Sequence, residues 1–252
     1  FVNQYDTSSP AYNVPAALRL SGDLDVAALE LAIRDVVERH ESLRTVYPNS
    51  VDGPWQNILD IDSSEVRDAL ALDVQHVPRE SLADVVLSVV SAGFDVSVDV
   101  PVRVRLCEVA GPDHGSGEFV LVIVAHHISS DGASLGPLAR DVMVAYAARA
   151  EGVVPVWEPL PVQYADFALW QRELLGDISD EGSVAARQLE FWRGVLEGVP
   201  DRLDLPSDRV RPAVRTLQGA THHFTIPADV HRKIVALART HSATPFMVVH
   251  AA

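Results

Sequence analysis

The sequence contains a single cysteine, Cys107, among its 252 residues. One cysteine excludes an intrachain disulfide and a metal site built from several thiolates, and it fits a reducing compartment such as the cytoplasm. Long hydrophobic runs are also missing, because the longest one, residues 119–125, is far too short to cross a bilayer. The sequence opens without the basic start and apolar stretch of a signal peptide. We therefore expect a cytoplasmic protein that does not act in a membrane.

Basic residues are scarce as well. The 20 Lys and Arg residues are outnumbered by 35 Asp and Glu residues, which leaves a formal net charge of -15 at pH 7. A surface this acidic repels phosphate groups, so we expect no nucleic-acid partner. Internal repeats and glycine-rich phosphate loops are absent. With 48% hydrophobic and 22% charged residues, the composition is that of a globular protein large enough to bury a substantial core.

Both ends of the sequence are unusual for a complete protein. It starts at Phe1 rather than at a methionine. Near the other end, Thr244-Pro245 has the pattern of an N-cap followed by a proline in the first helical turn. The helix that this pattern predicts has hardly begun when the sequence stops at Ala252. We expect the sequence to be part of a longer chain.

The hydrophobic periodicity predicts strands that alternate with helices. Residues 100–109 alternate as a half-solvated strand does, whereas residues 119–125 form the continuous apolar run of a central strand buried on both faces. Asp25 can cap a helix that runs to about His40. Further strands are expected at 18–20, 43–47, 56–60 and 221–226, and further helices at 81–92, 135–146, 164–175, 185–196 and 228–240. This alternation predicts a layered α/β sandwich.

A polar motif follows the buried strand at once: His126-His127-Ile128-Ser129-Ser130-Asp131-Gly132. Turns at strand ends, held by a rigid sheet, commonly present reactive groups. His127 can accept a proton from an attacking hydroxyl or amine, or it can hydrogen-bond that group into line. Asp131 can orient an imidazole, or it can pair with a buried arginine and hold the loop. Gly132 allows backbone conformations that other residues resist and leaves room for a substrate.

Other interpretations of this motif stay open on the residues alone. The histidine pair and Asp131 can have a purely structural role. They can also bind a metal ion, although adjacent histidines point in opposite directions if the chain is extended. A serine hydrolase is a further alternative, but the sequence has no Gly-x-Ser-x-Gly pattern. The candidate nucleophiles for that reaction are Ser129, Ser130 and Ser134.

Two further segments accompany the histidine motif in a fixed order. They are Arg39-His40-Glu41-Ser42-Leu43-Arg44-Thr45 and Tyr164-Ala165-Asp166-Phe167-Ala168-Leu169-Trp170. With the His-His-x-x-x-Asp-Gly pattern, they resemble the three motifs of the condensation-domain superfamily of nonribosomal peptide synthetases, and the likeness covers essentially the whole chain. This resemblance implies the fold of chloramphenicol acetyltransferase, an α/β (α+β) sandwich with a mixed central sheet flanked by helices.

Domains of this superfamily have two similar lobes and a reaction tunnel between them. The resemblance implies that residues 1–175 form the N-terminal lobe, that residues 176–215 form a helix and a linker, and that residues 216–252 begin a truncated C-terminal lobe. The resemblance also implies that the remainder of the second lobe, with the loops that close the tunnel, lies outside this sequence.

The resemblance also implies a reaction. A donor acyl or peptidyl group arrives as a thioester on the phosphopantetheine arm of one carrier domain, and the amine of an acceptor aminoacyl group arrives on a second carrier. An amide bond joins them. His127 matches the histidine that contacts the acceptor amine, as a base or as a positioning group, and His126 matches a structural histidine. The implied domain binds no cofactor or metal of its own.

The other motif residues receive implied roles in the loop. Asp131 matches an aspartate in a buried ion pair, and we expect Arg44 to be its partner, with Arg39 as the alternative. Gly132 can offer its backbone N–H to the developing oxyanion. The aromatic residues of 164–170 recur at helical spacing, and we expect them to pack in the core.

The expected partners are the donor and acceptor peptidyl carrier domains, a neighbouring adenylation domain and the missing C-terminal lobe. We expect a condensation domain of the type that takes an L-configured donor. The alternatives within the superfamily are an epimerisation domain and a stand-alone acyltransferase that esterifies a hydroxyl. A noncatalytic docking module, which recruits other enzymes to a carrier-bound peptide, is an alternative of a different class.

Overall fold

The computed structural model describes residues 2–4, 6–51, 53–110, 117–201, 206–210 and 222–252. The chain divides into two compact units, Phe1–Ser207 and Asp208–Ala252. The first unit contains the central sheet and all three family-like segments. Among the described residues, no helix combines the length and the apolar character that a membrane crossing requires.

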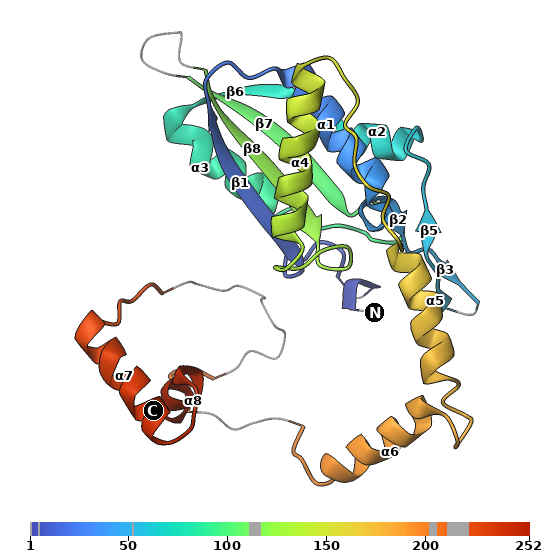
Figure 1. Cartoon of the computed structure of the whole chain (residues 1–252), viewed down its shortest axis with the longest axis vertical. Coiled ribbons are helices and arrows are strands. Elements are labelled where there is room, and N and C mark those ends of the chain that lie inside the picture. Colours follow the sequence, from blue (N-terminus) through green and yellow to red (C-terminus); the bar gives the residue numbers. More distant parts are fainter. Residues whose placement is uncertain (1, 5, 52, 111–116, 202–205, 211–221) are drawn as a thin grey trace. The chain divides into compact units, whose positions relative to one another are not determined.

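A mixed four-stranded sheet forms the centre of the first unit (Figure 1). Its strands are β1 (Asn13–Ser21), β8 (Glu118–His126), β7 (Val102–Ala110) and β6 (Val74–Pro78), and they lie side by side in this order. The β1–β8 and β8–β7 pairs are antiparallel, whereas the β6–β7 pair is parallel. The predicted mixed sheet is therefore confirmed, with the apolar strand β8 in its interior.

Helices cover both faces of this sheet. Helices α1 (Val26–Arg39) and α4 (Leu135–Ala150) lie on one face, and α3 (Leu82–Val90) lies on the other (Figure 1). Because successive side chains of a strand point to opposite faces, β8 contributes to both hydrophobic cores. Leu121 packs with α1 and α4, and Val122 packs in the cluster that includes α3. This layered packing confirms the predicted α/β sandwich.

Local capping explains several of the helix boundaries. The Asp25 carboxylate accepts a hydrogen bond of 2.9 Å from the Ala28 N–H at the start of α1, as its sequence pattern predicts. Helix α5 (Tyr164–Leu175) has the bounds that the periodicity predicts, and α6 (Val184–Val195) follows it. In the second unit, Thr244 caps the short helix α8 (Pro245–Ala251) by accepting a hydrogen bond from the Met247 N–H. Helix α7 (Ala228–Thr240) precedes it.

The sequence prediction was wrong or incomplete at several short elements. Helix α2 (Ser64–Leu70) and strand β6 were missed, because both are too short to show a clear period. The strand expected at 43–47 is only partly formed, because Leu43 and Arg44 end the 3₁₀ turn η2 (Glu41–Arg44) and β2 (Thr45–Val46) is the extended part. The short strands that remain are β3 (Asn49–Ser50), which pairs with β4 (Gly53–Pro54), and β5 (Asn57–Ile58), which pairs with β2. The remaining 3₁₀ turns are η1 (Val2–Gln4) and η3 (Arg79–Ser81).

Two predicted strands also need correction. Residues 222–226 are irregular, and Thr221 lies outside the described residues. A strand requires a neighbour to accept and donate its backbone hydrogen bonds, and no described strand pairs with residues 222–226. Strand β7 is more buried than the half-solvated pattern predicts. On the face expected to be solvated, Cys107 is fully buried beside α3, and only Arg103 and Arg105 stay partly exposed.

Candidate functional site

The histidine pair lies at the point where β8 leaves the sheet. The His126 N–H donates a hydrogen bond of 2.9 Å to the carbonyl of Pro101, just before β7. The His127 N–H donates one of 2.7 Å to the carbonyl of Tyr12, just before β1. The two consecutive amides are thus held from opposite sides, so their side chains point in opposite directions. His126 is buried, with 6% of its surface exposed, and His127 is exposed.

The His126 ring is enclosed by two aromatic rings. The ring of Phe94 meets it edge to face with a centroid distance of 6.0 Å, and the ring of Tyr12 lies tilted at the same centroid distance. Its Nδ1 atom accepts a hydrogen bond of 3.1 Å from the Ile128 N–H. Burial lowers the pKa of His126, and the charge of His127 lowers it further. A neutral His126 with an unprotonated Nδ1 therefore holds the turn that follows it.

His127 is placed differently from its neighbour. Its backbone is held by Tyr12, but among the described residues its imidazole makes no hydrogen bond, ion pair or ring contact. An exposed imidazole on a backbone fixed at both neighbouring strands can accept a proton from a bound group or donate one to it. Of the two histidines in the motif, the structure leaves this one available to a substrate.

The expected ion pair of Asp131 with Arg44 is not formed, and neither is the alternative pair with Arg39. Asp131 is exposed, and its Oδ1 atom accepts hydrogen bonds from the Ser134 N–H at 2.9 Å and the Ser134 hydroxyl at 2.6 Å. These bonds lower the pKa of Asp131. Asp131 therefore bonds within the turn that leads into α4, close to the positive end of the helix dipole, and not to a distant arginine.

Both arginines are occupied elsewhere. The Arg44 guanidinium donates to the carbonyl of Leu59 and lies 3.4 Å from the Glu41 carboxylate. Arg39 donates to the carbonyl of Glu158 at 2.9 Å, and its guanidinium lies over the Trp157 ring at 4.9 Å from the centroid.

Arg39 does take part in a buried charge cluster, with a residue that the sequence analysis missed. Its Nε atom lies 3.2 Å from the carboxylate of Asp141 on α4, and the His40 Nε2 atom lies 2.9 Å from the same oxygen. Asp141 is 4% exposed and also accepts hydrogen bonds from Arg140. Burial raises the pKa of Asp141, but the bonds from His40 and Arg140 outweigh it, so the net direction is downward. An acidic residue three positions after Leu138, on the predicted apolar face, was the available signal.

The three family-like segments are brought together by these contacts. Asp141 joins the end of α1 to α4, which follows the histidine turn. The side chain of Gln163, at the start of α5, donates to the Arg39 carbonyl at 2.9 Å and accepts from the Glu41 N–H at 3.3 Å. Gln163 therefore links the segment 39–45 to the start of the segment 164–170, and Asp141 links the segment 39–45 to the helix after the histidine turn.

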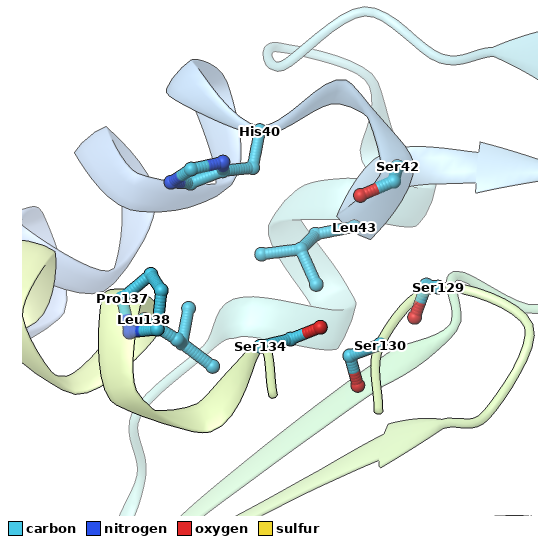
Figure 2. Close-up of a pocket in the computed structure, with 8 residues that line it drawn as sticks. All are labelled: His40, Ser42, Leu43, Ser129, Ser130, Ser134, Pro137 and Leu138. Carbon is cyan, nitrogen blue, oxygen red and sulfur yellow. The ribbon is translucent and has the colours of Figure 1, made fainter. Parts of the chain in front are cut away.

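A cavity of about 260 Å³ lies between η2 and the histidine turn (Figure 2). Serine side chains from both sides border it, and the buried hydroxyl of Ser130 has no hydrogen-bond partner within the described part of the chain. His127 is not among its lining residues, so this cavity lies behind the turn rather than at the exposed imidazole. It is lined by His40, Ser42, Leu43, Ser129, Ser130, Ser134, Pro137 and Leu138.

Two further expectations are corrected at this site. Gly132 is not in the left-handed backbone region, and a side chain added there would meet open space. Its place in the motif is therefore not explained by backbone strain. The aromatic residues of α5 are not in the core: Tyr164, Phe167 and Trp170 are 52%, 40% and 56% exposed. They form a row in which neighbouring rings lie 5.9 Å and 5.7 Å apart.

No group of three or more His, Cys, Asp or Glu residues in the described ranges is arranged to hold a metal ion. The imidazole of His127 is exposed and therefore open to a bound molecule.

Comparison with known proteins gives concordant matches. The family model of the condensation domain matches residues 1–252. A probable nonribosomal peptide synthetase of Salinispora arenicola is 47% identical over 252 residues, which is 100% of this chain and 3% of that protein. A dimodular nonribosomal peptide synthase of Bacillus subtilis is 45% identical over 249 residues, which is 99% of this chain and 10% of that protein.

Among solved structures, the chain is similar to the X-domain from teicoplanin biosynthesis. The TM-score is 0.83, the sequence identity is 33%, and the match covers 94% of this chain and 50% of that one. The same X-domain in complex with OxyB gives a TM-score of 0.81. The chain thus spans about half the length of the solved domains that it matches and a small part of the synthetases.

Proposed function

The chain belongs to the condensation-domain family of nonribosomal peptide synthetases, and we propose that it takes part in amide bond formation between two carrier-bound substrates. The observation that carries this proposal is the exposed imidazole of His127 on a backbone held by Pro101 and Tyr12. The donor is an acyl or peptidyl thioester, and the acceptor is the amine of an aminoacyl thioester.

In the proposed reaction the acceptor amine attacks the donor thioester carbonyl. The new C–N bond forms, the C–S bond breaks, and the donor phosphopantetheine leaves as a thiol. His127 contacts the attacking amine, aligns it and receives its proton, which the departing sulfur finally takes up. Thioesters already react with amines, so holding the two groups together and in line supplies much of the acceleration. Gly132, in the same turn, offers its N–H to the developing oxyanion.

The organisation that we propose follows the family. Residues 1–175 form the N-terminal lobe, residues 176–215 connect the lobes, and residues 216–252 begin the C-terminal lobe. The partners are a donor carrier domain, an acceptor carrier domain, an adjacent adenylation domain and the rest of the second lobe. The substrates bring the phosphopantetheine arms, and the domain holds no cofactor itself. Its preference for an L-configured donor and its cytoplasmic location stay predictions.

The test uses the full-length protein with both carriers loaded, and intact-protein mass spectrometry follows the acyl group. We expect transfer to the acceptor amine, and we expect His127→Ala to slow this transfer about 100-fold, the lower end of the range for a lost general acid or base. His76→Ala is the matched control, because His76 is an exposed histidine on β6 with 81% of its side chain accessible. Exchange of the donor α-proton without transfer would support epimerisation instead, and transfer to a hydroxyl would support ester formation.

A docking role is the second candidate, because the similar X-domain has been solved in complex with OxyB. In that case the domain would bind another enzyme and present a carrier-bound peptide to it. The motif histidines are present in this chain, which favours catalysis. Unchanged transfer by the His127→Ala protein, together with tight binding of a tailoring enzyme, would favour docking.

A further inference from the structure

The wall behind His126 is built by a segment outside the histidine motif. Phe94 is 2% exposed, and the edge-to-face contact with His126 is made by its ring. The neighbouring backbone is tightly packed, because a side chain in place of Gly93 would come within 2.1 Å of the Thr7 carbonyl oxygen. The backbone at Gly93 therefore lies close against Thr7, and this position determines where the adjoining Phe94 ring can lie.

Arg103 on β7 holds this segment in place. Its Nη1 atom donates to the Ala92 carbonyl at 3.1 Å, and its Nη2 atom donates to the Gly93 carbonyl at 2.9 Å. The same guanidinium lies over the Phe94 ring, with Cζ 4.2 Å from the centroid. A planar guanidinium suits this arrangement, because it can bind two carbonyls with its edge while it stacks on an aromatic face.

The orientation of the His126 ring has a direct consequence for the turn. Its Nδ1 atom accepts the Ile128 N–H, so a rotated ring would leave that N–H without its partner. The contacts run without a gap from Arg103 to Phe94, from Phe94 to His126, and from His126 to the residue that follows His127.

We propose that Arg103 is a positioning residue for the histidine turn. Arg103 acts through the Phe94 ring on His126 and so fixes the backbone that presents His127. The importance of this role for turnover rests on the proposed function, whereas its effect on the turn does not. Arg103 touches no substrate in this role.

Arg105 provides a matched control. It lies two residues further along β7, on the same side of the strand, and it is also partly exposed. Its guanidinium donates to the adjacent Val104 carbonyl and not to residues 92–94. Loss of Arg105 removes a similar charge and a similar amount of side chain from the same strand, but it leaves the contacts behind His126 intact.

The experiment compares Arg103→Ala, Arg103→Lys and Arg105→Ala in the full-length protein. Amide hydrogen exchange of the peptide that contains Ile128 is measured by mass spectrometry, and kcat and KM are measured for transfer from a loaded donor carrier. For Arg103→Ala we expect exchange about tenfold faster at this peptide, since its hydrogen bond to His126 is weakened. We also expect kcat to fall about tenfold, with KM for both carriers unchanged, because the reacting groups bind but are misaligned.

Arg103→Lys should fall between the wild type and Arg103→Ala, because an ammonium group stacks on Phe94 but cannot bind both carbonyls as a fork. Arg105→Ala should match the wild type in exchange and in kcat. If Arg103→Ala does not fold, Phe94→Leu takes its place, since it removes the ring edge and should give the same two changes. Exchange and kcat equal to those of Arg105→Ala would overturn the proposal. If the wild type forms no amide, the proposed function fails, and the exchange comparison still decides the role of Arg103.

Discussion

The sheet lobe (the four-stranded sheet with helices α1, α3 and α4) and the helices after residue 160 both carry large apolar side chains, but they bury them very differently. In the lobe, Leu106, Leu121 and Val122 are almost completely buried between layers of helices. After residue 160, the described residues that are buried are Ser183 and Ala238, whereas aromatic side chains of α5 and α6 are half exposed. Large apolar side chains therefore form a core in the first region and an uncovered surface in the second.

Two of the family-like segments lie in these two different regions. The histidine motif lies in the packed region, and its geometry is determined by neighbours that the lobe itself supplies. The row Tyr164, Phe167 and Trp170 lies in the uncovered region, where few contacts fix the side chains. Substitutions in the two regions should therefore have very different effects on the stability of the chain.

The largest effect is expected in the sheet core. Leu106→Ala removes a side chain with no exposed surface from β7, and the cavity that it leaves should cost about 2–5 kcal/mol of the free energy of unfolding. Urea denaturation followed by circular dichroism measures this change. A cost below about 0.5 kcal/mol, the size expected for exposed sites, would mean that the lobe is not packed as described.

Asp141→Asn should have the next largest effect. This change removes the charge that Arg39, His40 and Arg140 surround, and hydrogen bonds to charged groups are worth about 1.5–3 kcal/mol. The pKa of Asp141 is lowered in the folded protein, so its stabilising contribution is present above the unfolded pKa of about 3.9 and is lost as the pH falls through the folded value. The difference between wild type and variant should therefore shrink on acidification. A difference independent of pH down to the acid transition would contradict the charge pairing.

Asp131→Asn should have a smaller effect. The Asn side-chain oxygen can still accept the two hydrogen bonds from Ser134, so the turn before α4 is kept and only the favourable charge is lost. We expect amide formation within about threefold of the wild type, since a surface charge near a helix end contributes little. Kinetics with loaded carriers would check this, and Ser134→Ala provides the comparison that removes the hydroxyl partner. A loss as large as that of His127→Ala would show that Asp131 has a further partner.

Trp170→Ala should have the smallest effect on this chain. Its side chain is 56% exposed, and exposed substitutions usually change the free energy of unfolding by no more than about 0.5 kcal/mol. The same substitution in the full-length protein tests whether another part of the protein covers the aromatic row. A clear destabilisation there, with none in the isolated chain, would show that the two regions differ only because the second one lacks its cover.

The sequence predicted elements best where local signals decide them. Periodicity and capping, which act over a few residues, predict the bounds of α5 and the Asp25 cap. The continuous apolar run of β8 predicts its interior position in the sheet. The sequence also placed His127 at the end of a buried strand, which is where the structure has it.

Partners distant in the chain could not be predicted in the same way. Asp131 and Asp141 are both acidic residues close to the start or on the face of α4, and either could have been the partner of an arginine. Only the packing of α1 against α4 decides that Asp141 meets Arg39 while Asp131 bonds to Ser134 in the turn before α4. The exposure of Trp170 was equally unpredictable, because an apolar pattern does not say whether a partner is present to cover it.

The two backbone bonds that hold the histidine pair also have a practical consequence for recombining such domains. The His126 N–H is hydrogen-bonded to the Pro101 carbonyl, and the His127 N–H is hydrogen-bonded to the Tyr12 carbonyl. The turn therefore depends on two segments that lie far from it in the chain. A crossover between residues 13 and 101 would join a Tyr12 segment from one parent to the turn of another. Chimeras that inherit all three segments from one parent should keep the geometry of the turn, whereas those that divide them combine parts that were never selected to fit.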